Sequence, residues 1–303
     1  MSQEQKDAVD QLMREVPLDF AGDLAEQRVL LEQIMTSHPL ADDVAIGSDA
    51  IGAVPVVSVE LADIDAEGTI LYFHGGAYTM GSAAAAAGLA SELARRAECR
   101  VISVDYRLAP EHPYPAALED ALAAYEGVLG SGISASEIAV AGESAGGGLA
   151  MAMLAALPAR GLPQPSSVTV FSPWVDLTLS GNSIVAKAAV DPSITAAGLR
   201  RRAADYIGEA DAAGGLISPV FADLHGLPPL LVQAGSNEIL LDDAARLAAR
   251  AAADDVAVTL EITPGVPHVF QAFAAILDEA DAALTRAGAF IRAHLRTTST
   301  THR

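Results

Sequence analysis

Basic side chains are scarce in this chain of 303 residues. Lysine and arginine together number 18, against 39 aspartate and glutamate residues, so the formal net charge is −21 at pH 7. A surface this negative repels nucleic acid and anionic membranes, both of which attract lysine and arginine. We therefore expect neither nucleic acid nor a membrane among the partners of the protein.

Cysteine and long apolar segments are nearly absent as well. Cys99 is the only cysteine, which excludes an intramolecular disulfide and fits a reducing compartment. No apolar run approaches the roughly 18 residues of a membrane-spanning helix. The first ten residues, MSQEQKDAVD, lack the apolar stretch of a signal peptide. Together these absences lead us to expect a cytoplasmic protein.

Hydrophobic residues nonetheless make up 51% of the chain, enough for a large folded core. Short apolar segments alternate with helical patterns along most of the sequence. Strands are predicted at residues 54–61, 69–73, 101–104, 138–141, 168–171, 230–233 and 258–262, and helices at 83–97, 116–129, 145–157, 242–253 and 278–295. This alternation is typical of an α/β fold, with a mainly parallel sheet covered by helices on both faces.

Two segments interrupt the alternation and predict a second part of the molecule. Residues 1–45 predict one or two amphipathic helices before any strand, and residues 176–216 separate two strands by more than an ordinary crossover. We expect these segments to pack together as a helical cap. The catalytic domain would then comprise residues 46–175 and 217–297, and residues 298–303 would form a frayed tail.

The segment Gly142-Glu143-Ser144-Ala145-Gly146 matches the pattern G-x-S-x-G. In this pattern a sharp turn between a strand and a helix exposes the serine, and the glycines remove side chains that would clash. The apolar run IAVA before the motif and the apolar helix pattern after it supply that context. The sequence therefore predicts that Ser144 is a nucleophile, although an ordinary helix N-terminus is the alternative.

A second glycine segment follows the predicted strand TILYF. It reads His74-Gly75-Gly76-Ala77, the type of loop whose backbone N–H groups form an oxyanion hole in esterases. We expect the N–H groups of Gly75 and Gly76, with that of Ala145 after the nucleophile, to face a developing oxyanion. The alternative is a plain glycine turn.

Six stretches taken together resemble the bacterial hormone-sensitive-lipase-like esterases of the α/β-hydrolase superfamily. They are HGGAYTMGS (74–82), DYRLAPEHPYPAALED (105–120), GESAGG (142–147), SPWVDLT (172–178), GSNEILLDDA (235–244) and PHVF (267–270). The first 50 residues match only in general character. The resemblance implies the α/β-hydrolase fold with a helical cap and the hydrolysis of carboxylic esters. Three positions depart from the family pattern: Ala77 replaces the third loop glycine, Glu143 stands where aspartate is common, and Glu238 occupies the usual aspartate position.

The base and acid that a serine nucleophile requires are expected to follow it in the order acid, then histidine. His268 lies in TPGVPHVF, directly after the last predicted strand, which makes it the predicted base. Glu238 lies on a loop after the strand 230–233, and the resemblance also places it at the acid position. Asp242 and Asp243 begin the next helix, where the helix dipole explains an acidic residue. Asp242 nevertheless remains an alternative acid.

These residues predict a carboxylic ester hydrolase that works through an acyl-enzyme intermediate, with no metal or organic cofactor. The resemblance to the family, with its lidded pocket, implies short, apolar esters as substrates. Lactones and small acetyl esters are alternative substrates, and a non-catalytic receptor for a small ligand on the same fold is an alternative class. Tyr78 and Trp174 adjoin the motifs and are predicted to line the substrate pocket, with packing in the core as the alternative. Because the strand 258–262 would be an exposed sheet edge, it predicts a homodimer through this strand and the neighbouring helix.

Overall fold

The computed structural model describes residues 3–37, 40–62, 66 and 68–296. Its centre is a sheet of eight strands in the spatial order β1-β2-β4-β3-β5-β6-β7-β8. The strands are β1 (Val44–Ile51), β2 (Val54–Leu61), β3 (Thr69–Phe73), β4 (Arg100–Val104), β5 (Ile138–Glu143), β6 (Ser167–Phe171), β7 (Leu230–Gly235) and β8 (Val258–Thr263). β2 runs antiparallel to β1 and β4, and all the other neighbours are parallel. The predicted mainly parallel α/β sheet is confirmed.

Each of the seven predicted strands is present, and β1 was not predicted. β1 pairs with β2 along its whole length, from Val44 opposite Leu61 to Ile51 opposite Val54. No residue of β1 is fully buried, and its centre holds Gly47, Ser48 and Asp49. An edge strand that buries no face has no apolar pattern in its sequence, which is why it escaped prediction.

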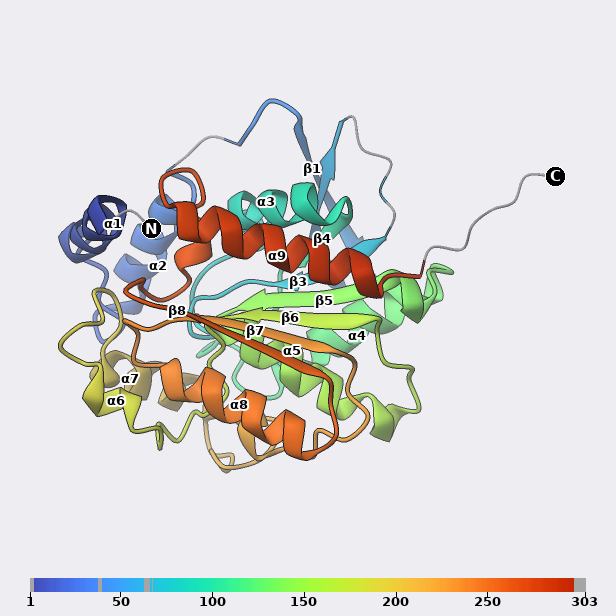
Figure 1. Ribbon diagram of the computed structural model, residues 1–303. Coiled ribbons are helices and arrows are strands. Elements are labelled where there is room, and N and C mark those ends of the chain that lie inside the picture. Colours follow the sequence, from blue (N-terminus) through green and yellow to red (C-terminus); the bar gives the residue numbers. More distant parts are fainter. Residues whose placement is uncertain (1–2, 38–39, 63–65, 67, 297–303) are drawn as a thin grey trace.

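Helices cover both faces of the sheet (Figure 1). α3 (Ala87–Ala97) and α9 (Asp278–His294) lie side by side on one face, and α4 (Ala116–Gly130), α5 (Ala145–Ala156) and α8 (Leu241–Ala253) lie on the other. The helices are within two residues of their predicted ends, except that α3 begins four residues later than expected. No helix in the described ranges is both long and apolar enough to span a bilayer.

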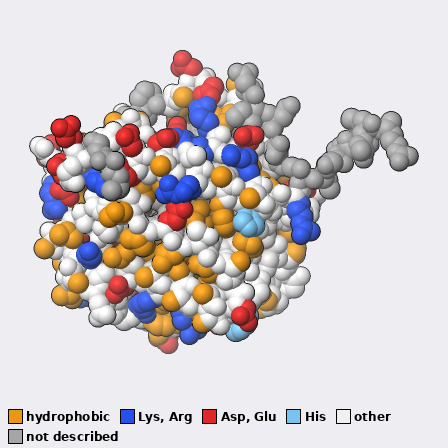
Figure 2. Space-filling view, viewed as in Figure 1, with side chains coloured by type: hydrophobic (Ala, Val, Ile, Leu, Met, Phe, Trp, Pro, Cys, Tyr) orange, Lys and Arg blue, Asp and Glu red, His pale blue; other side chains and the backbone are white. Residues whose placement is uncertain are grey.

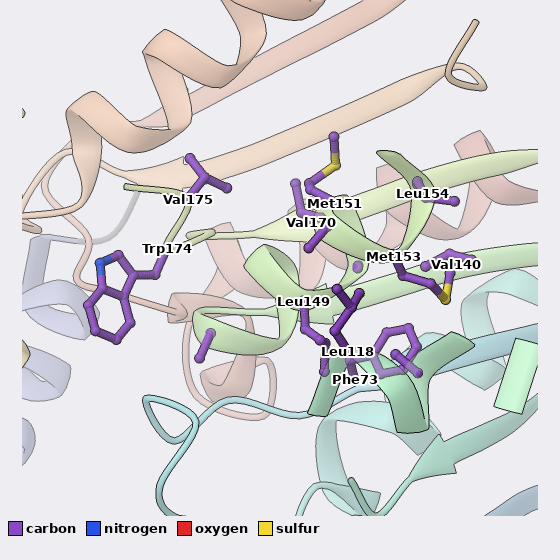
Figure 3. Close-up of a cluster of buried hydrophobic side chains, with 14 of the residues drawn as sticks. Phe73, Leu118, Val140, Leu149, Met151, Met153, Leu154, Val170, Trp174 and Val175 are labelled. Atoms are coloured by element: carbon purple, nitrogen blue, oxygen red, sulfur yellow. The ribbon is translucent and has the colours of Figure 1, made fainter. Parts of the chain in front are cut away.

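The main core lies between the sheet and the helices α4, α5 and α8. Figure 3 shows part of it, where Phe73 and Val140 from the strands meet Leu149 and Met153 from α5. Eleven of the twelve residues of α5 are buried, so this helix passes through the core with no solvent-facing stripe. Burying each large apolar side chain contributes about 1.5–3 kcal/mol, so the first turn of α5 is held firmly in place.

Four helices lie together at one end of the sheet (Figure 1). They are α1 (Gln3–Glu15), α2 (Leu24–Met35), α6 (Ser183–Ala186) and α7 (Ala196–Ile207), which come from the two segments predicted to form a cap. The guanidinium of Arg14 donates to the carbonyl of Val190, so the two segments are bonded directly. The division into a cap and a catalytic domain stays a prediction, and the predicted tail lies outside the described residues.

Candidate active site

Ser144 occupies a sharp turn between β5 and α5. Its backbone angles are φ 53° and ψ −122°, a conformation that L-residues rarely adopt. The turn brings α5 so close to the end of β3 that a Cβ on Gly146 would lie 2.0 Å from the carbonyl oxygen of Phe73. Only glycine fits there, so the G-x-S-x-G segment has the strand–turn–helix context that the sequence predicted.

His268 and Glu238 reach Ser144 from two other loops, which follow β8 and β7 at the carboxyl ends of the strands. The Nε2 atom of His268 lies 2.9 Å from Ser144 Oγ, and its Nδ1 atom lies 2.5 Å from Glu238 Oε2. Glu238 is completely buried, and its second oxygen accepts the Gly235 N–H at 2.9 Å. The structure thus brings the three residues together in one hydrogen-bonded line, which suits the transfer of a proton from the hydroxyl to the imidazole.

The two neighbouring aspartates have other partners. Asp242 accepts the backbone N–H of Ser183 at 3.0 Å, which ties α8 to the first residue of α6. Asp243 is buried and accepts the N–H groups of Val175 and Asp176, both at 2.9 Å. Both carboxylates therefore hold loops together, and the geometry favours Glu238 over Asp242 as the acid.

The glycine loop passes directly beside the nucleophile. A Cβ on Gly75 would lie 3.3 Å from Ser144 Cβ, and Gly76, Ala77 and Tyr78 all have positive φ angles, of 112°, 54° and 61°. Three successive residues in this conformation turn the chain back sharply after β3. Backbone N–H groups in such a turn point toward a common centre, which is how a loop binds an anion.

One expectation about this loop is wrong. The Gly75 N–H donates to Glu143 Oε1 at 2.7 Å, inside the protein. Because an amide has a single hydrogen, this group is not available to an oxyanion. The N–H groups of Gly76, Ala77 and Ala145 have no acceptor in the described part of the chain.

Glu143 is buried beside the nucleophile and connects the elbow to the glycine loop. Besides the Gly75 N–H, it accepts the hydroxyl of Tyr72. Burial raises the pKa of Glu143 to about 7, although its hydrogen bonds to Tyr72 and Gly75 and the nearby His268 favour the ionised form. The carboxylate therefore holds the loop at the edge of the site, as expected of a structural residue.

The stretch DYRLAPEHPYP supports the glycine loop from the other side. The Tyr106 hydroxyl donates to the carbonyl of His74 at 2.7 Å, and the two rings stack at 4.3 Å. Burial lowers the pKa of His74, which favours a neutral ring. From α2, Arg28 donates to the carbonyls of Thr79 and Ala109. The N-terminal helices thus hold the backbone that follows Gly76.

The segment 176–216 is attached to the loop that carries Glu238. Asp191 Oδ2 accepts the Ile239 N–H at 2.8 Å, and the Ser183 hydroxyl donates to the Ile239 carbonyl at 2.6 Å. Both backbone groups of the residue after Glu238 are therefore bonded to the segment 176–216. This attachment limits the movement of the Glu238 backbone relative to His268.

Tyr78 and Trp174, the two predicted pocket residues, are buried in the main core. Trp174 has no exposed surface and Tyr78 is 2% exposed, and their ring centroids lie 6.0 Å apart. Tyr78 also stacks on Tyr206 of α7, with centroids 3.9 Å apart and planes 9° apart. These rings connect the glycine loop to the cap, and their role in lining the pocket stays a prediction.

Sequence reasoning did not find the parts played by Arg28, Ser183 and Asp191. Each acts on a backbone group more than 45 residues away, so no local pattern marks it. Asp191 carries a weak signal, because it precedes Pro192 and Ser193 in a segment typical of a turn. Burial together with long-range partners identifies these residues only in the folded chain.

Among the described residues, one cluster outside the site has ligand atoms within 4.8 Å of one another, as a metal ion requires. It consists of Asp223, His225 and Asp254. Asp223 and His225 are exposed, and a hydrogen bond of 2.7 Å between them accounts for their arrangement. The cluster therefore carries no argument for a metal.

Comparison with known proteins decides the family. A family model described as the alpha/beta hydrolase fold matches residues 70–272. A crystal structure described as an esterase from the bacterial hormone-sensitive lipase family superposes with a TM-score of 0.94 at 40% sequence identity, and covers 98% of this chain and 100% of that chain. The chain belongs to the bacterial hormone-sensitive lipase family.

Curated relatives of this hormone-sensitive lipase family member agree with the assignment. An acetyl-hydrolase of Streptomyces hygroscopicus is 42% identical over 224 residues, 74% of this chain and 75% of the relative. An esterase of Acinetobacter venetianus is 38% identical over 261 residues, 85% of each chain. The family is hydrolytic, and the protein is a carboxylic ester hydrolase of the α/β-hydrolase fold. The alternative of a non-catalytic receptor therefore loses its support.

Proposed function

We propose that the protein hydrolyses carboxylic esters with Ser144 as nucleophile, His268 as general base and Glu238 as the acid that orients His268. The observation that carries this proposal is the pair of distances from His268, 2.9 Å to Ser144 Oγ and 2.5 Å to Glu238 Oε2. The short contact with a buried carboxylate favours the tautomer that has its proton on Nδ1. Nε2 is then left as an acceptor for the hydroxyl proton.

In the first step Ser144 Oγ attacks the ester carbonyl carbon while His268 Nε2 takes the hydroxyl proton. The carbonyl oxygen becomes an oxyanion, and the N–H groups of Gly76, Ala77 and Ala145 stabilise it. Removing one such donor typically costs about 3 kcal/mol of transition-state stabilisation. Collapse of the intermediate breaks the bond to the alcohol oxygen, which receives the proton from His268 and leaves an acyl group on Ser144. Water then repeats both steps and releases the acid.

The substrate class proposed is a short, apolar acyl ester. Helices α1, α2, α6 and α7 lie at the end of the sheet where β5 ends and Ser144 follows (Figure 1). If they cover the site as a cap, the space beneath them suits a small acyl group better than a long chain. Lactones and small acetyl esters remain the alternative, and the name of the Streptomyces relative, an acetyl-hydrolase, favours the acetyl esters. A series of p-nitrophenyl esters from acetate to dodecanoate tests the class. A maximum of kcat/KM at eight or more acyl carbons would contradict it.

The nucleophile and the acid are tested on the same ester. Ser144→Ala should lose all measurable turnover, and turnover that survives would remove Ser144 from the mechanism. Glu238→Gln should lower kcat by about 1,000-fold or more, because an amide no longer holds the tautomer and charge of His268. Asp242→Asn is the matched control, because Asp242 bonds to Ser183 instead. A larger loss for Asp242→Asn than for Glu238→Gln would reverse the assignment.

We also propose a homodimer formed along β8. This strand is an edge of the sheet, and its side chains Leu260 and Ile262 are 40% and 38% exposed. Figure 2 shows hydrophobic side chains gathered across the middle of this face, where β8 lies between α8 and α9. Light scattering should give twice the chain mass for the wild type and a monomer for Leu260→Lys. Ile276→Lys, at an exposed apolar residue outside β8, is the control, and a monomeric wild type would refute the proposal.

The cellular compartment stays a prediction. It rests on the single cysteine, Cys99. Fractionation of the native host, followed by detection of the protein with an antibody, would test it.

A further inference from the structure

Ser172 is a buried residue with a strained backbone, and its hydroxyl is bonded to the loop that carries His268. It directly follows β6, has no exposed surface, and has a φ angle of 45°, in the left-handed region that favours glycine. Its hydroxyl oxygen accepts the N–H of Val269, the residue after His268, at 3.0 Å. Strained residues persist only where their surroundings hold them, and they concentrate at functional sites.

The partner of this hydroxyl is strained as well. Val269 has a φ angle of 49°, which a β-branched residue very rarely adopts. Its N–H belongs to the peptide group that joins it to His268, and that group is planar. Holding this N–H in place therefore fixes the backbone from which the imidazole of His268 extends.

The segment that contains Ser172 also holds the nucleophile. The Ser144 N–H donates to the carbonyl of Phe171 at 2.9 Å, and the Trp174 N–H donates to the carbonyl of Ser144 at 2.9 Å. Both backbone groups of Ser144 are thus bonded to residues 171–174, and the hydroxyl of Ser172 bonds the same short segment to the residue after His268.

The segment 171–174 is itself fixed from two sides. The Ser172 N–H donates to the carbonyl of Gln233 on β7 at 2.7 Å. Pro173 packs against the first turn of α5, where a Cβ on Gly147 would lie 3.0 Å from the proline Cβ. The segment therefore forms a rigid support between the loop of the nucleophile and the loop of the base.

We propose that Ser172 is a positioning residue that sets the distance between the His268 imidazole and the Ser144 hydroxyl. That distance, 2.9 Å from Nε2 to Oγ, joins side chains whose loops follow two different strands. An error of about 1 Å in such a placement can cost about 100-fold in rate. This inference rests on the proposed roles of Ser144 and His268 and adds the residue that aligns them. Ser172 acts through the backbone next to His268 and takes no proton itself.

Two substitutions remove the hydroxyl and have opposite effects on the backbone. Ser172→Ala keeps a Cβ at φ 45°, whereas Ser172→Gly adopts the same angle without strain. Ser167→Ala is the matched control, because Ser167 is buried on the same strand and its hydroxyl has no hydrogen-bond partner among the described residues. For each protein we measure kcat and KM for p-nitrophenyl acetate, the melting temperature, and the rate at which diethyl p-nitrophenyl phosphate modifies Ser144.

Both Ser172 variants should lower kcat by about 10–100-fold and leave KM within about threefold, because a misplaced base slows proton transfer without changing the pocket. Modification of Ser144 should slow by a similar factor, since it needs the same base. Ser172→Gly should show this loss at a melting temperature close to that of the wild type, which separates positioning from folding. Ser167→Ala should keep the wild-type kcat.

The outcomes separate the two proposals. A wild-type kcat in either Ser172 variant, or a loss in Ser172→Ala that Ser172→Gly restores, would overturn the role of Ser172 and leave ester hydrolysis intact. No hydrolysis of the ester by the wild type would overturn the proposed function, and this inference with it.

A measurement on the wild type decides the matter if neither variant folds. In hydrogen exchange followed by NMR, the amide of Val269 should exchange at least about 10-fold more slowly than that of His268, which has no acceptor in the described part of the chain. Equal exchange rates for the two amides would show that Ser172 does not hold the loop, and would overturn the proposal.

Discussion

At the scale of single residues, Glu143 links two segments that are far apart in the sequence. Its carboxylate accepts the Gly75 N–H and the Tyr72 hydroxyl, and it directly precedes Ser144. The nucleophile and the donors of the proposed oxyanion hole are therefore held against each other by one buried side chain. A donor that is already fixed in place does not have to reorganise as the oxyanion forms, which is why it stabilises the transition state.

This link predicts the effect of two substitutions at Glu143. Glu143→Ala removes the acceptor of the Gly75 N–H, so the glycine loop should loosen and kcat for a short ester should fall about 10–100-fold. Glu143→Gln keeps an amide oxygen for the same N–H and should lose much less. Steady-state assays at pH 8, with circular dichroism to confirm folding, distinguish the two. Equal rates for both variants and the wild type would show that the link has no part in catalysis.

At the scale of elements, α1 supports the loop that carries His268. Val9 is completely buried against Val266 and Phe270, which flank the histidine. Lys6 donates to the Pro264 carbonyl at 2.7 Å and forms a buried ion pair of 3.3 Å with Glu279 of α9. The first helix of the chain thus packs on the last loop of the site, and the position of the imidazole depends on it.

We expect Val9→Ala to weaken this support. Loss of two buried methyl groups should cost about 2 kcal/mol of local stability. Amide hydrogen exchange of residues 264–270 should become faster, and kcat should fall several-fold. Leu12→Ala, on the same helix but 43% exposed, serves as the control. Unchanged exchange in Val9→Ala would mean that α1 does not stabilise the histidine loop.

Some parts of the fold and of the candidate site could be predicted from the sequence, and others could not. The strands β5, β7 and β8 were predictable from their apolar runs. The loops that follow parallel strands all lie at the carboxyl ends of those strands. The sequence could therefore predict that Ser144, Glu238 and His268 lie close together. The Gly75 error arose because Glu143, 68 residues away, competes for the same hydrogen. The run Arg200-Arg201-Arg202 looks uniformly exposed in sequence, and only packing against the cap distinguishes its third member.

At the scale of the whole molecule, two buried carboxyl groups make stability depend on pH. Burial raises the pKa of Glu143 from 4.5 to about 7 and that of Asp243 from 3.8 to about 8. Between the unfolded and folded values, each group holds a proton in the folded state that the unfolded chain releases. Folding therefore becomes less favourable as the pH rises through this window.

The free energy of unfolding should accordingly be lower at pH 8 than at pH 5. Glu143→Gln cannot ionise, so it should remove about 3 kcal/mol of this decrease, at 1.36 kcal/mol for each pKa unit. Urea unfolding followed by circular dichroism at both pH values measures the difference. A wild type that is more stable at pH 8 than at pH 5, or a decrease that is the same in Glu143→Gln, would contradict the assignment.

The packing of α1 on the histidine loop also bears on synthesis of the protein in the cell. Val9 and Val266 are 257 positions apart, so at about 5–20 residues per second α1 leaves the ribosome roughly 13–50 s before its partner is made. Throughout that interval Val9 lacks the residues, Val266 and Phe270, against which it packs in the folded protein. Chaperones that bind nascent chains therefore have a defined target in α1, and the enzyme acquires its histidine loop only after residues 264–270 have been synthesised.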